Sequence, residues 1–159
     1  MKRTWTFTQT SEIPAPMAAV WDRVVSPEGI NDELRPWMTM SVPRGAEGIT
    51  IDSLEIGPPI GRAWLRLFGV LPYDFDRLSI AEVEPGRYFR EESTMISMRR
   101  WTHQRRLEPI DDGRTGVTDT ITFSPRLGMV LAGPLLHRVL PALFRHRHRR
   151  LAAHFANDG

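Results

Sequence analysis

The sequence contains no cysteine and only one lysine, Lys2. Without cysteine the protein has no disulfide bond and no thiolate nucleophile, so both kinds of chemistry are excluded. The scarcity of lysine means that arginine carries almost all of the positive charge, which we interpret as a coding bias without functional weight. Long apolar runs are absent as well, since no stretch approaches the roughly 20 apolar residues of a membrane-spanning helix.

Other signals are also missing. The N-terminal segment, MKRTWTFTQT, has no apolar run after its charges, as a signal peptide would. We therefore expect a cytoplasmic protein without stable membrane insertion. There is no glycine-rich phosphate loop and no Ser-His-Asp motif. His146, His148 and His154 have neither the spacing nor the carboxylate partners of a zinc site. The sequence predicts no metal and no cofactor.

The length and composition are those of one globular domain. The chain has 159 residues, of which 41% are hydrophobic and 25% charged, without internal repeats or low-complexity linkers. We expect a single domain over residues 1–159. Residues 124–159 carry six arginines and one aspartate, a net charge of +5, whereas the whole chain has +2. Such a basic segment can contact a membrane or an acidic partner, although a solvated helix face is commoner. No aromatic-rich basic groove accompanies it, so nucleic acid is not expected.

The apolar pattern predicts a strand at residues 4–13, ended by Pro14. Pro16 then opens a helix with the apolar stripe Met17, Val20, Trp21 and Val24, which stops at Ser26-Pro27, and a second short helix covers residues 28–34. Strands are expected at residues 38–42, 52–56, 62–68, 75–83, 87–97, 99–107 and 114–123.

The C-terminal segment has the spacing of a long helix that covers a sheet. The residues three and four apart on its predicted inner face are Leu136, Leu140, Phe144, His148, Leu151 and Phe155. Pro141 either kinks this helix or begins its long part. One antiparallel sheet covered by one long helix is an α+β architecture, and if the two layers are splayed the space between them is a ligand pocket.

Residues 99–123, RRWTHQRRLEPIDDGRTGVTDTITF, predict a hairpin with the three-residue loop Asp111-Asp112-Gly113 and a left-handed glycine. Counting back from this loop gives the facing pairs Ile110 and Arg114, Leu107 and Val117, Arg105 and Asp119, His103 and Ile121, and Trp101 and Phe123. These pairs share the inner face of the sheet. Polar groups on an inner face are costly unless they are hydrogen-bonded, so the pattern favours a cavity over a dry core.

Four segments together resemble the START-like (SRPBCC, polyketide cyclase/dehydrase) superfamily, also called the helix-grip fold. They are EIPAPMAAVWDRV, RRWTHQRRLEP, GRTGVTDTITF and LFRHRHRRLAAHF. The resemblance covers nearly the whole chain. It implies a strongly bent antiparallel sheet of about seven strands that grips the C-terminal helix around an apolar cavity. It implies no metal, no nucleotide and no common catalytic residue, because the superfamily includes lipid carriers, hormone receptors and aromatase/cyclases.

Two groups on the inner face of the hairpin are candidate site residues. His103 is either a general acid/base or, as we prefer, a polar cavity residue that hydrogen-bonds a ligand or a neighbouring strand. Arg105 and Asp119 either anchor a ligand carboxylate or enol, or neutralise each other, which is the preferred interpretation because an unpaired buried charge is costly.

Further candidates lie outside the hairpin. Glu91 shares the inner face with Phe89 and either acts as a base beside His103 or pairs with an arginine such as Arg62 or Arg66, which we prefer. Tyr73 and Asp74 are expected on a proline-containing loop that rims the cavity or forms a surface turn. His148 either points into the cavity or is a hydrogen-bonded core histidine. Met38, Met40, Met95 and Met98 would make an adaptable wall. The full set of predicted ligand-binding residues is Trp101, His103, Arg105, Asp119, Glu91, Ile121, Phe123, Tyr73, Phe144 and His148.

The sequence thus predicts a protein that binds a hydrophobic or amphipathic small molecule, such as a lipid or a polyketide-like compound, between the sheet and the last helix. The alternative is an aromatase/cyclase or dehydratase in which His103 and Glu91 carry protons and Arg105 steadies an enolate. A third hypothesis is a module that binds a membrane or a partner through its basic C-terminal helix. The identity of the ligand and the oligomeric state stay open.

Overall fold

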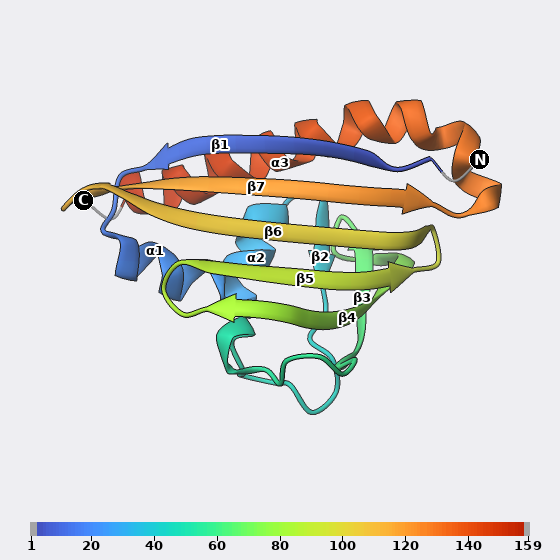
Figure 1. Ribbon diagram of the computed structural model, residues 1–159, viewed down its shortest axis with the longest axis horizontal. Helices are drawn as coiled ribbons and strands as arrows, with labels where there is room; N and C mark the ends of the chain where they lie inside the picture. Colours follow the sequence, from blue (N-terminus) through green and yellow to red (C-terminus); the bar gives the residue numbers. More distant parts are fainter. Residues whose placement is uncertain (1–2, 158–159) are drawn as a thin grey trace.

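The computed structural model describes residues 3–157 (Figure 1). The helices are α1 (Met17–Val24), α2 (Pro27–Leu34) and α3 (Gly133–Asn157), with short 3-10 turns at Ile51–Ser53 and Leu127–Ala132. The strands are β1 (Trp5–Ile13), β2 (Met38–Met40), β3 (Gly61–Leu67), β4 (Leu71–Glu84), β5 (Tyr88–Met95), β6 (Met98–Asp111) and β7 (Arg114–Pro125).

The seven strands form one antiparallel sheet in the order β1-β7-β6-β5-β4-β3-β2. The sheet is curled: β1, β7, β6 and β5 follow the long axis of the molecule, whereas β2 and β3 are turned across it (Figure 1). Strand β4 carries an extra residue on each side: Tyr73 is unpaired opposite β3, and Ala81 is unpaired opposite β5. These irregularities accompany the turn of the sheet, because a bulge bends the strand that carries it. With α3 along the sheet, the predicted helix-grip α+β fold is confirmed.

The two short helices are positioned by local hydrogen bonds and by one close backbone contact. The Ser26 hydroxyl caps α2 by accepting a hydrogen bond from the Gly29 amide at 3.0 Å, and Pro27 occupies the first turn. A Cβ at Gly29 would lie 1.9 Å from the Arg23 carbonyl oxygen, so only glycine lets α2 pack this closely on the end of α1. Asn31 then joins α2 to β2 through two hydrogen bonds with the backbone of Met40, at 2.7 and 3.0 Å.

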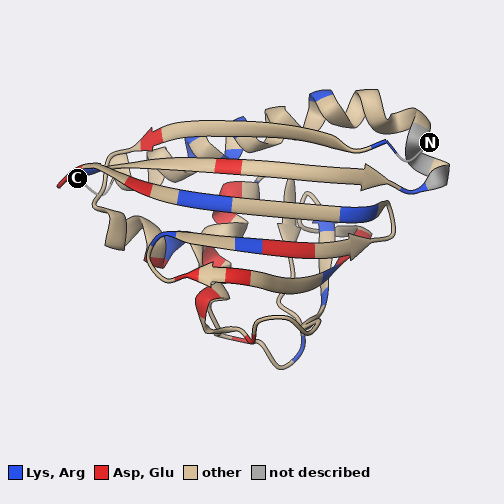
Figure 2. Cartoon of the chain, in the orientation of Figure 1, with Lys and Arg blue, Asp and Glu red and all other residues tan. Residues whose placement is uncertain are grey.

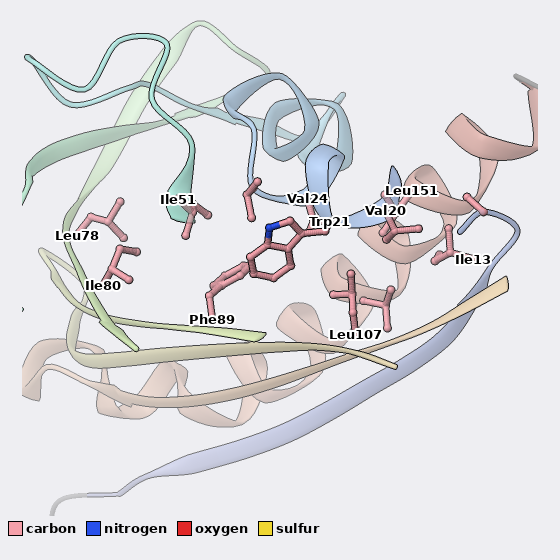
Figure 3. Packing of buried hydrophobic residues seen from close by; sticks show 13 residues of the cluster. Ile13, Val20, Trp21, Val24, Ile51, Leu78, Ile80, Phe89, Leu107 and Leu151 are labelled. Atoms are coloured by element: carbon pink, nitrogen blue, oxygen red, sulfur yellow. The ribbon is translucent and has the colours of Figure 1, made fainter. Parts of the chain in front are cut away.

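The buried apolar residues form two clusters. The first lies where α1 and the end of α3 meet the sheet, and Figure 3 shows Trp21 and Phe89 at its centre; their rings meet edge to face. The second lies nearer the start of α3 and consists of Leu65, Met95, Met98, Ile121, Phe123 and Phe144. The elements β6, β7 and α3 each contribute to both clusters and carry polar residues between them.

The predicted register of β6 and β7 is confirmed from Leu107–Val117 to Trp101–Phe123, including the facing pair of Arg105 and Asp119. The predicted loop is wrong in detail. Asp111 already pairs with Arg114, so the connection has two residues, and the pairing shifts at Pro109–Asp111 to absorb the difference. The backbone of Gly113 is not left-handed. Because of this shift, the strand pairs from Leu107–Val117 onward are the predicted ones, and their side chains lie on the predicted face although the loop is one residue shorter.

Three other expectations need correction. Residues 52–56 are not a strand, because Ile51–Ser53 forms a 3-10 turn and only Ile56 bridges to Ile80. Tyr73 and Asp74 lie in the first part of β4, since this strand is longer than its apolar alternation indicates. The last helix starts before Pro141 and continues through it, so the proline does not begin its long part.

Asp74 illustrates what the longer β4 does. Its buried carboxylate accepts hydrogen bonds from the amides of Phe75, Ile96 and Ser97 at 2.7–3.3 Å, and from the Ser97 hydroxyl. Asp74 therefore ties β4 to the turn between β5 and β6. We expect Asp74→Ala to lower the free energy of unfolding by about 2–3 kcal/mol, because three backbone amides and one hydroxyl lose a charged acceptor.

Urea denaturation measures this loss, and hydrogen exchange should show the Ile96 and Ser97 amides losing protection first. Glu92→Gln, in the neighbouring strand and exposed, is the control. Equal stability of the two variants would contradict the assigned role of Asp74.

Candidate functional site

A fully buried ion cluster lies between the two apolar clusters. The guanidinium of Arg105 (0% exposed) donates two hydrogen bonds to Asp119 on the adjacent strand, both at 2.7 Å. It donates two more to Glu33 on α2, at 2.9 and 2.7 Å. Figure 2 shows acidic and basic positions side by side in the middle of β5, β6 and β7. The prediction that Arg105 and Asp119 neutralise each other is confirmed, and the cluster also includes Glu33.

Helix α3 holds α2 so that Glu33 reaches the cluster. Arg147 donates to Glu33 at 3.3 Å, and Arg150 donates to the carbonyl oxygen and the carboxylate of Asp32 at 3.0 and 2.8 Å. His146 forms a further hydrogen bond with the Arg35 carbonyl oxygen at 2.6 Å. Helices α2 and α3 are thus joined by ionic and polar contacts next to Glu33, which lies against Arg105 of the sheet.

Two histidines complete the hydrogen bonding of Asp119. Nε2 of His103 lies 2.8 Å from Oδ1, and Nε2 of His148 lies 2.6 Å from Oδ2. Because an ionised carboxylate only accepts, each Nε2 carries the proton. In His148 the other nitrogen, Nδ1, forms a hydrogen bond with the Ser11 hydroxyl at 2.5 Å. Of the two interpretations of His148, the hydrogen-bonded core histidine is therefore the one confirmed.

Burial and charge act against each other in this cluster. Burial opposes ionisation of Asp119, but the charge and hydrogen bonds of Arg105 outweigh it and hold the pKa of Asp119 well below its usual range. The same balance lowers the pKa of Glu33. For His103, burial prevails over the attraction of Asp119 and lowers the pKa. His103 is therefore neutral near pH 7, with a free lone pair on Nδ1.

A cavity of about 220 Å³ adjoins the cluster on the side of β3, β4 and β5. It is bordered by the curled sheet, α2, the segment before the 3-10 turn at 51–53, and the first half of α3. Among the predicted ligand-binding residues, those that line it are Trp101, His103, Glu91, Tyr73 and Phe144. The four methionines of the expected adaptable wall also line it.

The other five predicted residues do not line the cavity. Arg105, Asp119 and His148 satisfy one another in the ion cluster, whereas Ile121 and Phe123 pack in the second apolar cluster. All five lie on the inner face, as predicted. However, the cavity is displaced toward the curled end of the sheet, because α3 packs closely against the β1 side.

Glu91 faces His103 directly across β5 and β6, with 4.0 Å between Oε2 and Nδ1. The preferred pairing of Glu91 with Arg62 or Arg66 is wrong. Both arginines alternate with the inward Ala63 and Leu65, and Arg62 packs on the ring of Phe75 on the outer face. No described arginine forms an ion pair with Glu91.

Two acids on the cavity wall are shifted toward the neutral form. Burial raises the pKa of Glu91 to about 8, and the charge of Asp76 adds to this effect. Burial likewise raises the pKa of Asp76 to about 7; the Ser93 hydroxyl acts against this rise and the charge of Asp74 adds to it. Since a pKa near neutrality lets a group take up or release a proton at physiological pH, this wall differs chemically from the ion cluster beside it.

Sequence reasoning missed Glu33, Asp76 and Arg147, although each carries a recognisable signal. Glu33 follows the apolar Ile30 by three positions on α2, and Arg147 follows Phe144 by three on α3. Asp76 alternates with the buried Leu78 in β4. In each case a charged residue occupies a position that the period of its element assigns to the inner face.

The fold and the cavity define the class: the protein has the START-like helix-grip fold. A START superfamily protein from Mycobacterium smegmatis superposes with a TM-score of 0.70 at 10% identity, over 97% of this chain and 99% of that one. The Zhui aromatase/cyclase from Streptomyces sp. R1128 gives 0.64 at 17% identity, over 98% and 93%. Ara h 8.0201 gives 0.65 at 14% identity, over 98% and 99%.

Within that class, the chain belongs to the DUF8410 family, described as a domain of unknown function, whose model matches residues 11–155. A comparison with curated proteins finds no match. In the part of the chain that the structure describes, no helix combines the length and apolar character needed to cross a membrane.

Proposed function

We propose that the protein binds a hydrophobic or amphipathic small molecule in the cavity between the curled sheet and α3. The observation that carries this proposal is a cavity whose lining is mostly apolar and includes a small number of polar and charged side chains, with Asp76, Glu91 and His103 on the adjacent strands β4, β5 and β6. Apolar surface supplies affinity, about 25 cal/mol per Å² removed from water, and a few converging polar groups set orientation. This distribution is typical of ligand pockets rather than of packing defects.

The size of the cavity limits the ligand. A cavity of about 150 Å³ accommodates benzene, so about 220 Å³ suits a fused two-ring compound or a short lipid-like chain. Methionines on β2, β5 and β6 can change rotamer at low cost and adapt the wall to ligands of somewhat different shape. A polyketide-like fragment and a short amphipathic lipid both meet these requirements.

Filling the cavity tests the proposal. Ala63 on β3 is buried, lines the cavity and faces Asp76 on β4. We expect Ala63→Phe to weaken the binding of 2-naphthol, a neutral two-ring probe, at least about tenfold, because the new ring occupies the space of the probe. Isothermal titration calorimetry measures the affinity, and circular dichroism confirms that the variant is folded.

Arg62→Leu, one residue away on the outer face, is the matched control and should bind 2-naphthol like the unaltered protein. Failure of the unaltered protein to bind the probe, or equal binding by both variants, would count against this cavity as the binding site. Native mass spectrometry of protein purified from its own host, followed by organic extraction, would identify a natural ligand.

The second candidate is an enzyme of the aromatase/cyclase or dehydratase kind. This candidate is favoured because Glu91 and the neutral His103 face each other on the cavity wall. Near pH 7 Glu91 holds a proton and Nδ1 of His103 offers a lone pair, so the two could transfer protons to and from a substrate. Asp119 would orient the His103 ring through Nε2. Arg105 is less suited to the enolate-binding role, because its donors are directed at Glu33 and Asp119.

His103→Ala separates the two candidates. In a binding protein we expect a change in ligand affinity of less than about tenfold, since one neutral hydrogen bond contributes only about 1 kcal/mol. In an enzyme the same substitution should abolish turnover and largely spare binding. The measurement compares affinity and turnover for whatever compound the extraction yields, or for a panel of polyketide-like compounds.

The third hypothesis concerns the basic C-terminal helix as a membrane or partner contact. Part of its charge is used inside the molecule, because Arg147 and Arg150 bind Glu33 and Asp32. Binding through the exposed Arg138, Arg145 and Arg149 would weaken steeply with salt, whereas binding in the cavity would not. A titration at two salt concentrations distinguishes these modes.

A further inference from the structure

The polar wall of the cavity has an excess of carboxylates. The acids in the ion cluster or on the wall are Glu33, Asp74, Asp76, Glu91 and Asp119, and the guanidiniums among them are Arg105 and Arg147. Arg105 is fully engaged by two of these acids, and Arg147 contacts Glu33 and the ring of Phe144. Neither forms an ion pair with the acids of the wall in the described residues.

The acids of the wall differ in how they are satisfied. Asp74 accepts hydrogen bonds from three amides and a hydroxyl, so its carboxylate needs no further donor. Asp76 is 3% exposed and lines the cavity, yet its Oδ1 has no hydrogen-bond partner among the described residues. For Glu91, the polar contact found among the described residues is the distant one with His103, at 4.0 Å. A buried acceptor without a donor is costly, and it is a specific feature that a ligand can satisfy.

We propose that the polar end of the ligand is a protonated amine, which pairs with Asp76 while Glu91 adds a second acid to the same wall. This inference rests on the proposed binding function and specifies its ligand class. A cationic amine supplies a donor for Oδ1 and a positive charge beside two acids that have no arginine partner in the described residues. A carboxylate ligand would leave Oδ1 of Asp76 without a donor and would add a further acid to this wall, while Arg147, the arginine on the cavity lining, already pairs with Glu33.

The remaining lining fits the rest of such a ligand. Aromatic rings of Phe89, Trp101 and Tyr73 line the cavity and can pack on a two-ring body or on the face of the ammonium group. Near pH 7 and without a ligand, Glu91 is mostly protonated and Asp76 is about half protonated, since the pKa of Asp76 is raised to about 7 and that of Glu91 to about 8. A cation beside them lowers both pKa values, so binding of the amine should release protons.

Other titratable groups face the same cavity and must be considered. His103 is neutral, and its Nδ1 lone pair does not repel a cation. Arg147 does repel one, but its charge is compensated by Glu33. The amine is therefore expected at the end of the cavity formed by β4 rather than beside α3.

Three probes of the same shape test the proposal. Tryptamine, tryptophol and indole-3-propionate share an indole ring and a two-carbon link, and they end in an ammonium, a hydroxyl and a carboxylate group. By calorimetry at pH 7 we expect tryptamine to bind at least about tenfold more tightly than tryptophol, the advantage of a charged over a neutral hydrogen bond. Indole-3-propionate should bind least. Titrations in buffers of different ionisation enthalpy should show proton release with tryptamine only.

Asp76→Asn should remove the advantage of tryptamine over tryptophol while leaving the affinity for tryptophol within about threefold. Glu91→Gln should reduce the advantage of tryptamine without removing it. Glu92→Gln, next to Glu91 but exposed on the outer face, is the control and should keep the full advantage. Tryptophol affinity also shows that the Asp76→Asn cavity is intact.

Equal binding of tryptamine and tryptophol, or an advantage that persists in Asp76→Asn, would overturn the amine assignment while the binding function stands. If neither the three probes nor 2-naphthol bind, the proposed binding function fails together with this inference.

Discussion

Replacing Arg105 with methionine is expected to lower the free energy of unfolding by about 3–5 kcal/mol. The substitution keeps an unbranched side chain of similar length but leaves Glu33 and Asp119 buried without their cation. Both acids have pKa values below their usual range because of Arg105, so both are ionised in the folded protein at pH 7. Two uncompensated carboxylates in the interior are among the largest single-site penalties a domain of this size can carry.

Urea denaturation at pH 7 measures the effect. Arg106→Met is the matched control, since Arg106 is exposed on the outer face and packs on the Tyr88 ring; we expect it to cost about 0.5–1 kcal/mol. Similar losses for the two variants would contradict a stabilising role of the ion cluster. A double variant, Arg105→Met with Glu33→Leu, should recover part of the loss, because it removes one of the stranded charges.

The pH dependence provides a second readout. A group whose folded pKa is lowered contributes stability that is present above its unfolded pKa and is lost as the pH falls through the folded pKa. The contribution of Asp119 and Glu33 is therefore lost in acid, below about pH 4. The difference between the unaltered protein and Arg105→Met should shrink over the same range.

Replacing Glu91 with glutamine is expected to act in the opposite direction and stabilise the protein at pH 8. The pKa of Glu91 is raised from 4.5 to about 8 by burial. At 1.36 kcal/mol per pKa unit this corresponds to an upper limit of about 5 kcal/mol for ionising the acid in the folded state. We expect about 2 kcal/mol, because water that enters the cavity screens part of the charge.

The direction of this pH dependence follows from the protonation of Glu91 in the folded and unfolded chains. Below pH 4.5 Glu91 is protonated in both the folded and the unfolded chain, so glutamine brings no electrostatic gain. Between pH 4.5 and about 8 the folded protein keeps a proton that the unfolded chain has released, so its stability falls as the pH rises. The gain from Glu91→Gln should therefore grow across this window and level off above it.

Thermal unfolding of both proteins at several pH values from 4 to 9 tests this. Glu92→Gln, exposed on the outer face beside Arg90, should show no such trend. A gain that does not depend on pH would mean that Glu91 is not held in the neutral form by its surroundings. A stabilising substitution at a cavity residue is what a site maintained for binding predicts, because the acid costs stability in the absence of a ligand.

Much of the fold could be predicted because its signals are local. The stripe Val20, Trp21 and Val24 has helical spacing, and these residues are buried in α1. The Asp-Gly turn and the two-residue period placed Arg105 opposite Asp119, although the loop itself was wrong by one residue. His148 interrupts an apolar stripe, which marked it as an inner residue before any contact was known.

The site was less predictable because its contacts are long-range. Glu33 and Arg105 are 72 positions apart, and nothing near either residue indicates the other. The preferred arginine partners of Glu91 were wrong because Arg62 and Arg66 lie on the outer face of β3. Which face of β3 is the inner one depends on how the strand packs in the curled sheet, and this cannot be inferred from its sequence neighbours.

The sequence by itself determined the order of the elements, the inner face of the β6–β7 hairpin and the presence of charged groups on that face. Hydrophobic periodicity and turn residues depend on a few neighbouring positions, so they can be recognised without knowing which distant segment packs against them. Only the tertiary structure decided which of these charged groups form ion pairs and which line the cavity. The two irregularities in β4 accompany the curl of the sheet, which leaves the cavity beside Asp76 and Glu91, while α2 and α3 bring Glu33 to Arg105. Both outcomes depend on how distant segments pack, and no local pattern encodes that packing.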